Sequence, residues 1–112
     1  MKAAKLSDYH RGWFIGDFDP SLEKTEDVEV AVKHFRAGEH ESLHYHKIAT
    51  EYTCVIKGSV QMFGKTWGPG DIVIAEPGDA TSFLALFDAD LVVVKLPGAK
   101  NDKYLGCPEG CC

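Results

Sequence analysis

The chain has 112 residues, of which 45% are apolar and 26% charged; this composition suits one globular domain and excludes a disordered chain. With 12 basic and 17 acidic side chains the formal net charge is −5, so we expect neither nucleic acid nor an anionic membrane surface as a partner. No apolar run approaches the roughly 20 residues that span a bilayer, and the first ten residues lack the apolar segment of a secretory signal, so we expect a cytoplasmic protein.

Short β-branched and aromatic segments separated by Gly, Pro and Asp predict an all-β sandwich or barrel, and no stretch shows convincing helical spacing. In chain order we expect strands at 13–18, 28–36, 42–46, 51–57, 59–63, 65–67, 71–75, 81–87 and 90–96. Gly64 and Lys65 are expected to form a two-residue hairpin turn, because the first position of such a turn often needs a positive φ.

The whole chain, 1–112, is interpreted as a single domain whose core covers about residues 28–96. A strand segment precedes this core, and a polar, glycine-containing tail follows Pro97 and shows no strand alternation. We expect this tail to contribute little to the barrel. Its cysteines, Cys107, Cys111 and Cys112, do not match a zinc-ribbon spacing and are expected to be exposed, reduced thiols.

Alternation along strands assigns their faces. In segment 28–36, Glu29 and Lys33 share one parity, so we expect that face to meet water and the opposite face, with three valines and His34, to point inward. Few inward Arg or Lys side chains are therefore expected.

Segment 51–57 is largely apolar on both faces. Glu51, Thr53 and Val55 share one face, whereas the other face carries Tyr52, Cys54 and Ile56. A strand buried on both sides needs cover from another sheet or another subunit, so we expect a homodimer. The apolar cluster at 13–15 is expected to cross to the partner as an added strand; alternatively, the chain's own N-terminal segment covers this face in a monomer.

His44 and His46 lie two residues apart, so on a strand they project from one face. Glu51 follows after a four-residue break that allows the chain to turn into the neighbouring strand. Two imidazoles and a carboxylate would then converge as a two-histidine, one-carboxylate site with open coordination positions. Such a set would hold one divalent ion of Fe, Mn, Ni, Co or Zn.

The segment from Gly38 to Gly58 resembles the first sequence motif of the cupin family at every fixed position, including His44, His46 and Glu51. The second cupin motif is recognisable at 70–83 but altered. The position of the usual third metal-binding His holds Thr81, and that of the first Pro holds Glu76. The resemblance implies a small antiparallel β-barrel or jelly roll, often dimeric, with a metal ion near its centre.

The missing histidine leaves one position of the implied site open. His34, expected to face inward, is a candidate to replace that ligand or to act as a catalytic base, while a hydrogen-bonded barrel histidine remains the alternative. Thr81 and Ser82 are expected to be structural at the start of a strand, although Thr81 is also a candidate to touch metal-bound water. Glu76 is interpreted as a turn carboxylate.

Three functions remain open. The first is a metal-dependent enzyme of the dioxygenase, isomerase or decarboxylase type that acts on a small polar organic molecule. The second is a non-catalytic module that binds a small molecule or a metal ion. The third is a metal-independent protein similar to sugar-nucleotide epimerases, which would need a His–Asp pair and inward basic residues; the expected scarcity of such residues ranks it last.

Overall fold

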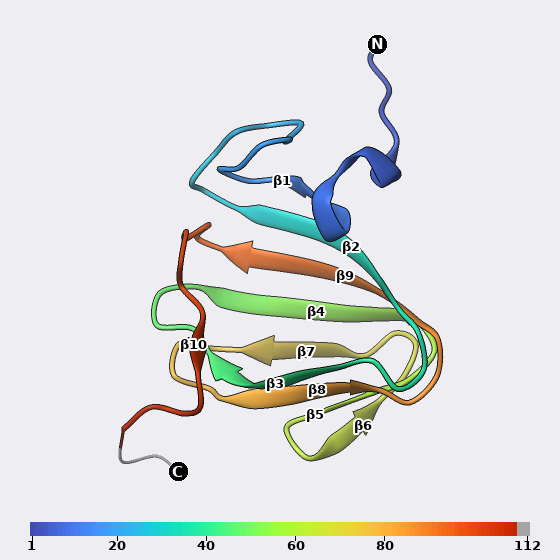
Figure 1. Cartoon of the computed structure of the whole chain (residues 1–112), viewed down its shortest axis with the longest axis vertical. Coiled ribbons are helices and arrows are strands. Elements are labelled where there is room, and N and C mark those ends of the chain that lie inside the picture. Colours follow the sequence, from blue (N-terminus) through green and yellow to red (C-terminus); the bar gives the residue numbers. More distant parts are fainter. Residues whose placement is uncertain (110–112) are drawn as a thin grey trace.

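The computed structural model describes residues 1–109, which form two antiparallel sheets packed against each other, as Figure 1 shows. Two short 3-10 helices come first, η1 (Leu6–Asp8) and η2 (His10–Gly12). The strands are β1 (Trp13–Ile15), β2 (Glu29–Phe35), β3 (His40–Tyr45), β4 (Thr50–Lys57), β5 (Val60–Met62), β6 (Lys65–Trp67), β7 (Ile72–Ala75), β8 (Thr81–Ala85), β9 (Ala89–Leu96) and β10 (Tyr104–Leu105). Within this part of the chain, no helix has the length and apolar character needed to cross a membrane.

One sheet has the strand order β1-β2-β9-β4-β7 and the other β10-β3-β8-β5-β6. Small and branched apolar side chains from both sheets fill the space between them, with Leu91, Val55 and Val60 as the largest that are almost fully buried. The prediction of an all-β jelly roll is therefore confirmed.

All nine expected strands are present, and their ends differ from the expected ones by at most three residues. The turn between β5 and β6 is shifted by one residue from its expected place. Met62 pairs with Lys65, so the two turn residues are Phe63 and Gly64, with φ of 52° and 69°. Two consecutive positive φ values match the right-handed twist of a tight hairpin, and Gly64 meets this need without strain.

The faces of β2 are opposite to those expected. Ala31 is fully buried, and Glu29, Lys33 and Phe35, which share its parity, line the space between the sheets. His34 points outward and its Nδ1 lies 2.6 Å from Oδ1 of Asp90 at the surface. The expectation that His34 faces the interior was wrong, because the interior here is a polar cavity and its charged lining resembles a solvent-exposed face in the sequence.

The segment after Pro97 is more structural than its composition indicated. β10 pairs with β3, and the Tyr104 ring stacks on Tyr45 at a centroid distance of 5.5 Å. Asp102 is only 6% exposed, and its carboxylate accepts hydrogen bonds from the backbone N–H groups of Lys47, Ile48 and Ala49. The expectation that this tail contributes little was wrong, because its contacts are made to a loop more than 50 residues away.

The cysteines also differ in part from the expectation. Cys54 is a free cysteine and is half-buried on the outer face of β4. Cys107 is disulfide-bonded, which corrects the expectation of a reduced thiol at that position. Cys111 and Cys112 lie outside the described residues.

In reducing buffer, which opens the disulfide of Cys107, truncation after Gly106 should change the free energy of unfolding by no more than about 1 kcal/mol, the scale of loose surface segments. The reason is that Asp102 and β10 remain in place. Urea unfolding measures this change, and truncation after Asn101, which removes both features, should give a much larger loss. Equal losses from the two truncations would show that the cysteine segment, and not Asp102, secures the tail.

Candidate metal and ligand site

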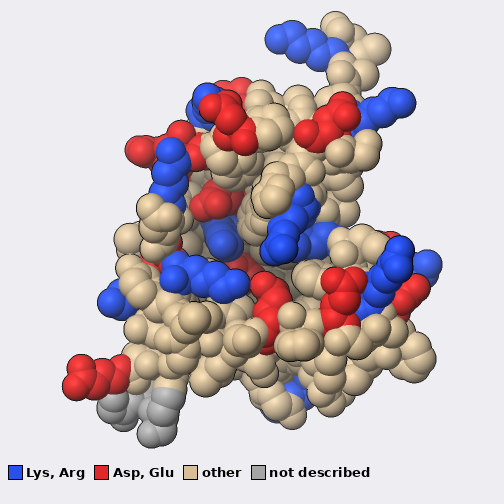
Figure 2. Space-filling model, viewed as in Figure 1, with Lys and Arg blue, Asp and Glu red and all other residues tan. Residues whose placement is uncertain are grey.

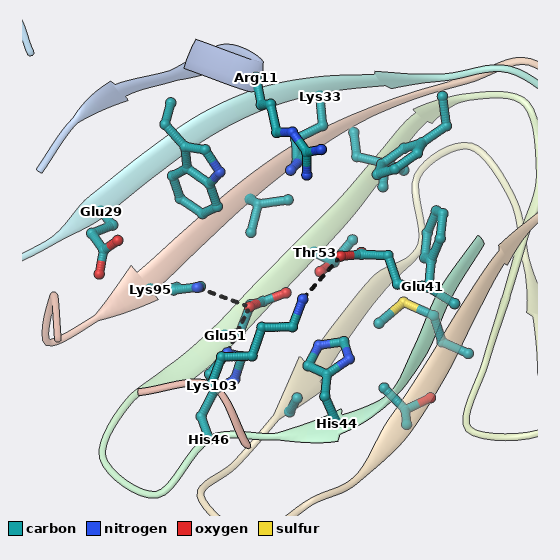
Figure 3. Close-up of a pocket in the computed structure, with 18 of the residues that line it drawn as sticks. Arg11, Glu29, Lys33, Glu41, His44, His46, Glu51, Thr53, Lys95 and Lys103 are labelled. Atoms are coloured by element: carbon teal, nitrogen blue, oxygen red, sulfur yellow. Dashed lines mark ion pairs between the residues drawn. The ribbon is translucent and has the colours of Figure 1, made fainter. Parts of the chain in front are cut away.

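A cavity of about 410 Å³ lies between the two sheets and opens on one face of the molecule. Figure 2 shows a hollow in this face with basic and acidic side chains gathered around it. His44 on β3, His46 just after β3 and Glu51 at the start of β4 all line the cavity. The structure thus brings the three sequence-predicted ligands to one place, as Figure 3 shows.

The His44 ring is held by its own strand. Its Nδ1 lies 2.8 Å from the carbonyl oxygen of Ser42, and a carbonyl can only accept, so Nδ1 is the donor. In the neutral ring this leaves the lone pair on Nε2. A backbone carbonyl that fixes the tautomer in this way is the usual support for a metal-binding histidine.

His46 is buried, with 6% of its surface exposed, and its Nε2 lies 3.8 Å from Oε2 of Glu51. Burial lowers the pKa of His46, the nearby Lys95 ammonium lowers it further, and the Glu51 carboxylate opposes both. The imidazole is therefore kept neutral at physiological pH, which is the form that metal ligation requires. The ring of His44 meets that of His46 edge-on at a centroid distance of 5.7 Å.

The three side chains are of the right chemical type for a metal ion, but they are not arranged closely enough to hold one. Two imidazole nitrogens and a carboxylate oxygen suit Fe, Mn, Ni, Co or Zn in the divalent state. As the side chains stand, however, no three His, Cys, Asp or Glu groups within residues 1–109 are close enough together to hold an ion. Glu51 is also shared, since its Oε2 lies 3.8 Å from Nζ of Lys95.

Thr81 lies directly across from His44 in the sheet, at the start of β8. Its Oγ1 accepts a hydrogen bond from the Phe63 N–H at 2.8 Å and donates to the Ser82 carbonyl at 2.7 Å. The hydroxyl group is thus engaged with the backbone, which agrees with the structural role expected for Thr81. Glu76 is exposed in the turn after β7 and does not line the cavity.

Four basic residues that were not expected from the sequence line the cavity: Arg11, Lys33, Lys95 and Lys103. The expected scarcity of inward basic side chains was therefore wrong. Burial lowers the pKa of Lys33, which Glu41 opposes and Arg11 reinforces. The sequence did contain one indication that Lys33 points inward: it has the same parity along β2 as the apolar residues Ala31 and Phe35.

Two of these cations are paired within the cavity wall. Lys95 faces Glu51 across β9 and β4, and Nζ of Lys103, just before β10, lies 3.5 Å from Oε2 of Glu41. The C-terminal segment therefore contributes directly to the cavity rim.

No protein-family model matches the chain. The chain is 28% identical over 109 residues to an oxalate decarboxylase of the fungus Arthroderma benhamiae. This similarity covers 89% of the chain but only 25% of the fungal protein, so the chain spans about a quarter of the length of this curated relative.

Solved structures share the fold at lower identity. A double-stranded β-helix protein of Klebsiella pneumoniae has a TM-score of 0.71 at 22% identity, covering 96% of this chain and 93% of its own. An RmlC-like cupin of Shewanella frigidimarina has a TM-score of 0.60 at 20% identity, covering 70% and 72%. The oxalate decarboxylase of Bacillus subtilis, described with Mn(II) centres, has a TM-score of 0.59 at 24% identity, covering 72% and 24%.

Proposed function

We propose that this chain, which has the cupin double-stranded β-helix fold, binds one divalent transition-metal ion and acts as an enzyme on a small polar organic molecule. The ligands would be His44, His46 and Glu51. The observation that carries the proposal is their convergence in one cavity, with His46 kept neutral and the His44 tautomer set by Ser42.

A metal ion held by three side chains would keep open positions, where it would polarise a carboxylate, enol or hydroxy-ketone as a Lewis acid. The protein's own groups would bind and orient the substrate, because Thr53 and the lysines lie on the same cavity walls. Manganese is the first ion to test, since the related Bacillus fold is described with Mn(II) centres. Decarboxylation of a small acid is the first reaction to assay, since the fungal relative is named for it.

Elemental analysis of protein purified without a polyhistidine tag should find close to one divalent metal ion per chain. Replacing His46 with alanine should remove most of it, because two remaining side-chain ligands hold such ions weakly. The matched control is His40→Ala, since His40 is exposed at the start of β3 and does not line the cavity. Circular dichroism checks that both variants fold, and undiminished metal in folded His46→Ala would refute the ligand assignment.

A second candidate, a non-catalytic binding module, is favoured by the contact between Lys95 and Glu51, because an ammonium group competes with a metal ion for the carboxylate. A Lys95→Met variant that binds metal more tightly without gaining turnover would favour this module.

The main argument against an epimerase-like protein was the expected scarcity of inward basic residues, and this argument no longer holds, because basic residues line the cavity. Its His–Asp pair, however, is found only at His34 and Asp90 on the outer surface among residues 1–109.

A further inference from the structure

Arg11 and Lys33 bring two positive charges together at the cavity, and Figure 3 shows both side chains pointing into it from neighbouring elements. Within residues 1–109, neither the guanidinium nor this ammonium forms an ion pair. The carboxylates that act most strongly on Lys33 are those of Glu41 and Glu51. Each of these carboxylates is closer to its own lysine partner, so within residues 1–109 no carboxylate forms a direct ion pair with Arg11 or Lys33, although Glu41 and Glu51 act on Lys33 from a greater distance.

The position of Arg11 is held by the backbone. Its φ of 51° and ψ of 29° are left-handed values that a non-glycine residue seldom adopts. The next residue, Gly12, lies so close to β2 that a Cβ there would come within 1.8 Å of the Val32 carbonyl oxygen. The N-terminal segment therefore packs closely against β2. The left-handed backbone conformation of Arg11 is strained, and it directs the guanidinium group over the cavity.

Lys33 is flanked by aromatic rings. Its Nζ lies 5.4 Å from the centroid of Trp13 and 5.7 Å from that of Phe35. Phe35 in turn packs against Phe83 at 4.5 Å, and all three rings line the cavity. A ligand that reaches the two cations therefore has flat apolar walls beside it.

We propose that Arg11 and Lys33 form the subsite for the carboxylate of a small unsaturated or aromatic acid whose flat body lies against Trp13, Phe35 and Phe83. A carboxylate would supply a direct counter-ion and accept charge-assisted hydrogen bonds from both side chains. This proposal deepens the proposed function by naming the substrate class of the same cavity. The N-terminal segment contributes Arg11 and Trp13 to this subsite.

The test is a calorimetric titration of the full chain, treated with chelator, with benzoate and with its neutral isostere benzamide. Benzoate should bind at least about tenfold more tightly than benzamide, because only the anion gains charge-assisted contacts. Arg11→Gln and Lys33→Gln should each weaken benzoate binding about tenfold or more and leave benzamide binding unchanged. Lys33→Arg should retain most of the preference for the anion.

Arg36→Gln and Lys57→Gln are the matched controls, since each removes one positive charge at an exposed position outside the cavity. Both should bind benzoate like the unmodified protein. The proposal is overturned if benzoate fails to bind at about 10 mM, if benzamide binds equally well, or if both cavity variants keep full affinity. The titration needs no metal, so a preference for benzoate in a protein that binds no metal would support the subsite and contradict only the metal site. A protein that binds metal but shows no preference for benzoate would contradict only the subsite.

Discussion

Replacing Asp102 with alanine should lower the free energy of unfolding by about 3 kcal/mol or more, as measured by urea denaturation. The buried carboxylate accepts hydrogen bonds from three consecutive backbone N–H groups, at 47, 48 and 49, and alanine would leave these donors without an acceptor. The N–H of Ala49 is buried and those of Lys47 and Ile48 are partly buried; a fully buried donor without an acceptor costs about 1–3 kcal/mol, and a partly buried one costs less. The same loop joins His46 to Glu51, so the variant should also bind metal more weakly.

The matched control is Asp71→Ala. Asp71 is exposed and accepts a single backbone hydrogen bond, from Gly68 at 2.8 Å, so its loss should amount to about 1 kcal/mol or less. Similar losses for the two variants would contradict the role of Asp102 as the anchor of the loop.

The hydrogen bonds of Asp102 also predict how the free energy of unfolding depends on pH. Burial by itself would raise the pKa of Asp102, but the hydrogen bonds from Ala49, Lys47 and Ile48 together bring it below the ordinary value of 3.8. The unfolded chain therefore takes up this proton more readily than the folded one. The contribution of Asp102 is fully present above the ordinary pKa and is lost as the pH falls through the lower folded-state value. In the Asp102→Asn variant, the free energy of unfolding, measured by urea denaturation at a series of acidic pH values, should therefore fall less steeply as the pH is lowered.

Sedimentation equilibrium at micromolar concentration should give about twice the chain mass of 12.3 kDa. The outer face of β4 and β7 exposes an apolar surface, with Ile56, Ile72 and Ile74 at 56%, 58% and 52% exposure. Association of two copies about a twofold axis would bury this surface. A mass near that of one chain for the unmodified protein would reject the dimer.

Ile56→Asp and Ile74→Asp should each shift the mass to that of one chain, because a carboxylate buried in the interface would be left without a partner. Gln61→Asp is the control, since Gln61 is exposed on β5 in the other sheet and should leave the mass unchanged. The N-terminal segment does not offer the alternative cover. β1 lies at the opposite edge of the sheet from β7, and Trp13 lines the cavity within the chain.

Local patterns were sufficient to predict the strands and the grouping of the candidate ligands. The two-residue spacing of His44 and His46 and the short break before Glu51 act through the geometry of a strand and a tight connection. The structure places all three at one cavity, as expected. The interior face of β4 carries Glu51, Thr53 and Val55, the grouping that alternation predicted, and Thr53 and Val55 are buried.

The sequence by itself therefore determined the all-β class, the approximate positions of the strands and the grouping of His44, His46 and Glu51, because these depend on contacts between near neighbours. Only the tertiary structure decided which face of β2 is interior, since alternation distinguishes two faces but does not say which one meets water. A cavity lined by Lys33 and Glu29 has the same sequence pattern as a solvated face. The roles of Arg11 and Asp102 were likewise decided by tertiary contacts, because their partners lie some 20 and more than 50 residues away in the chain.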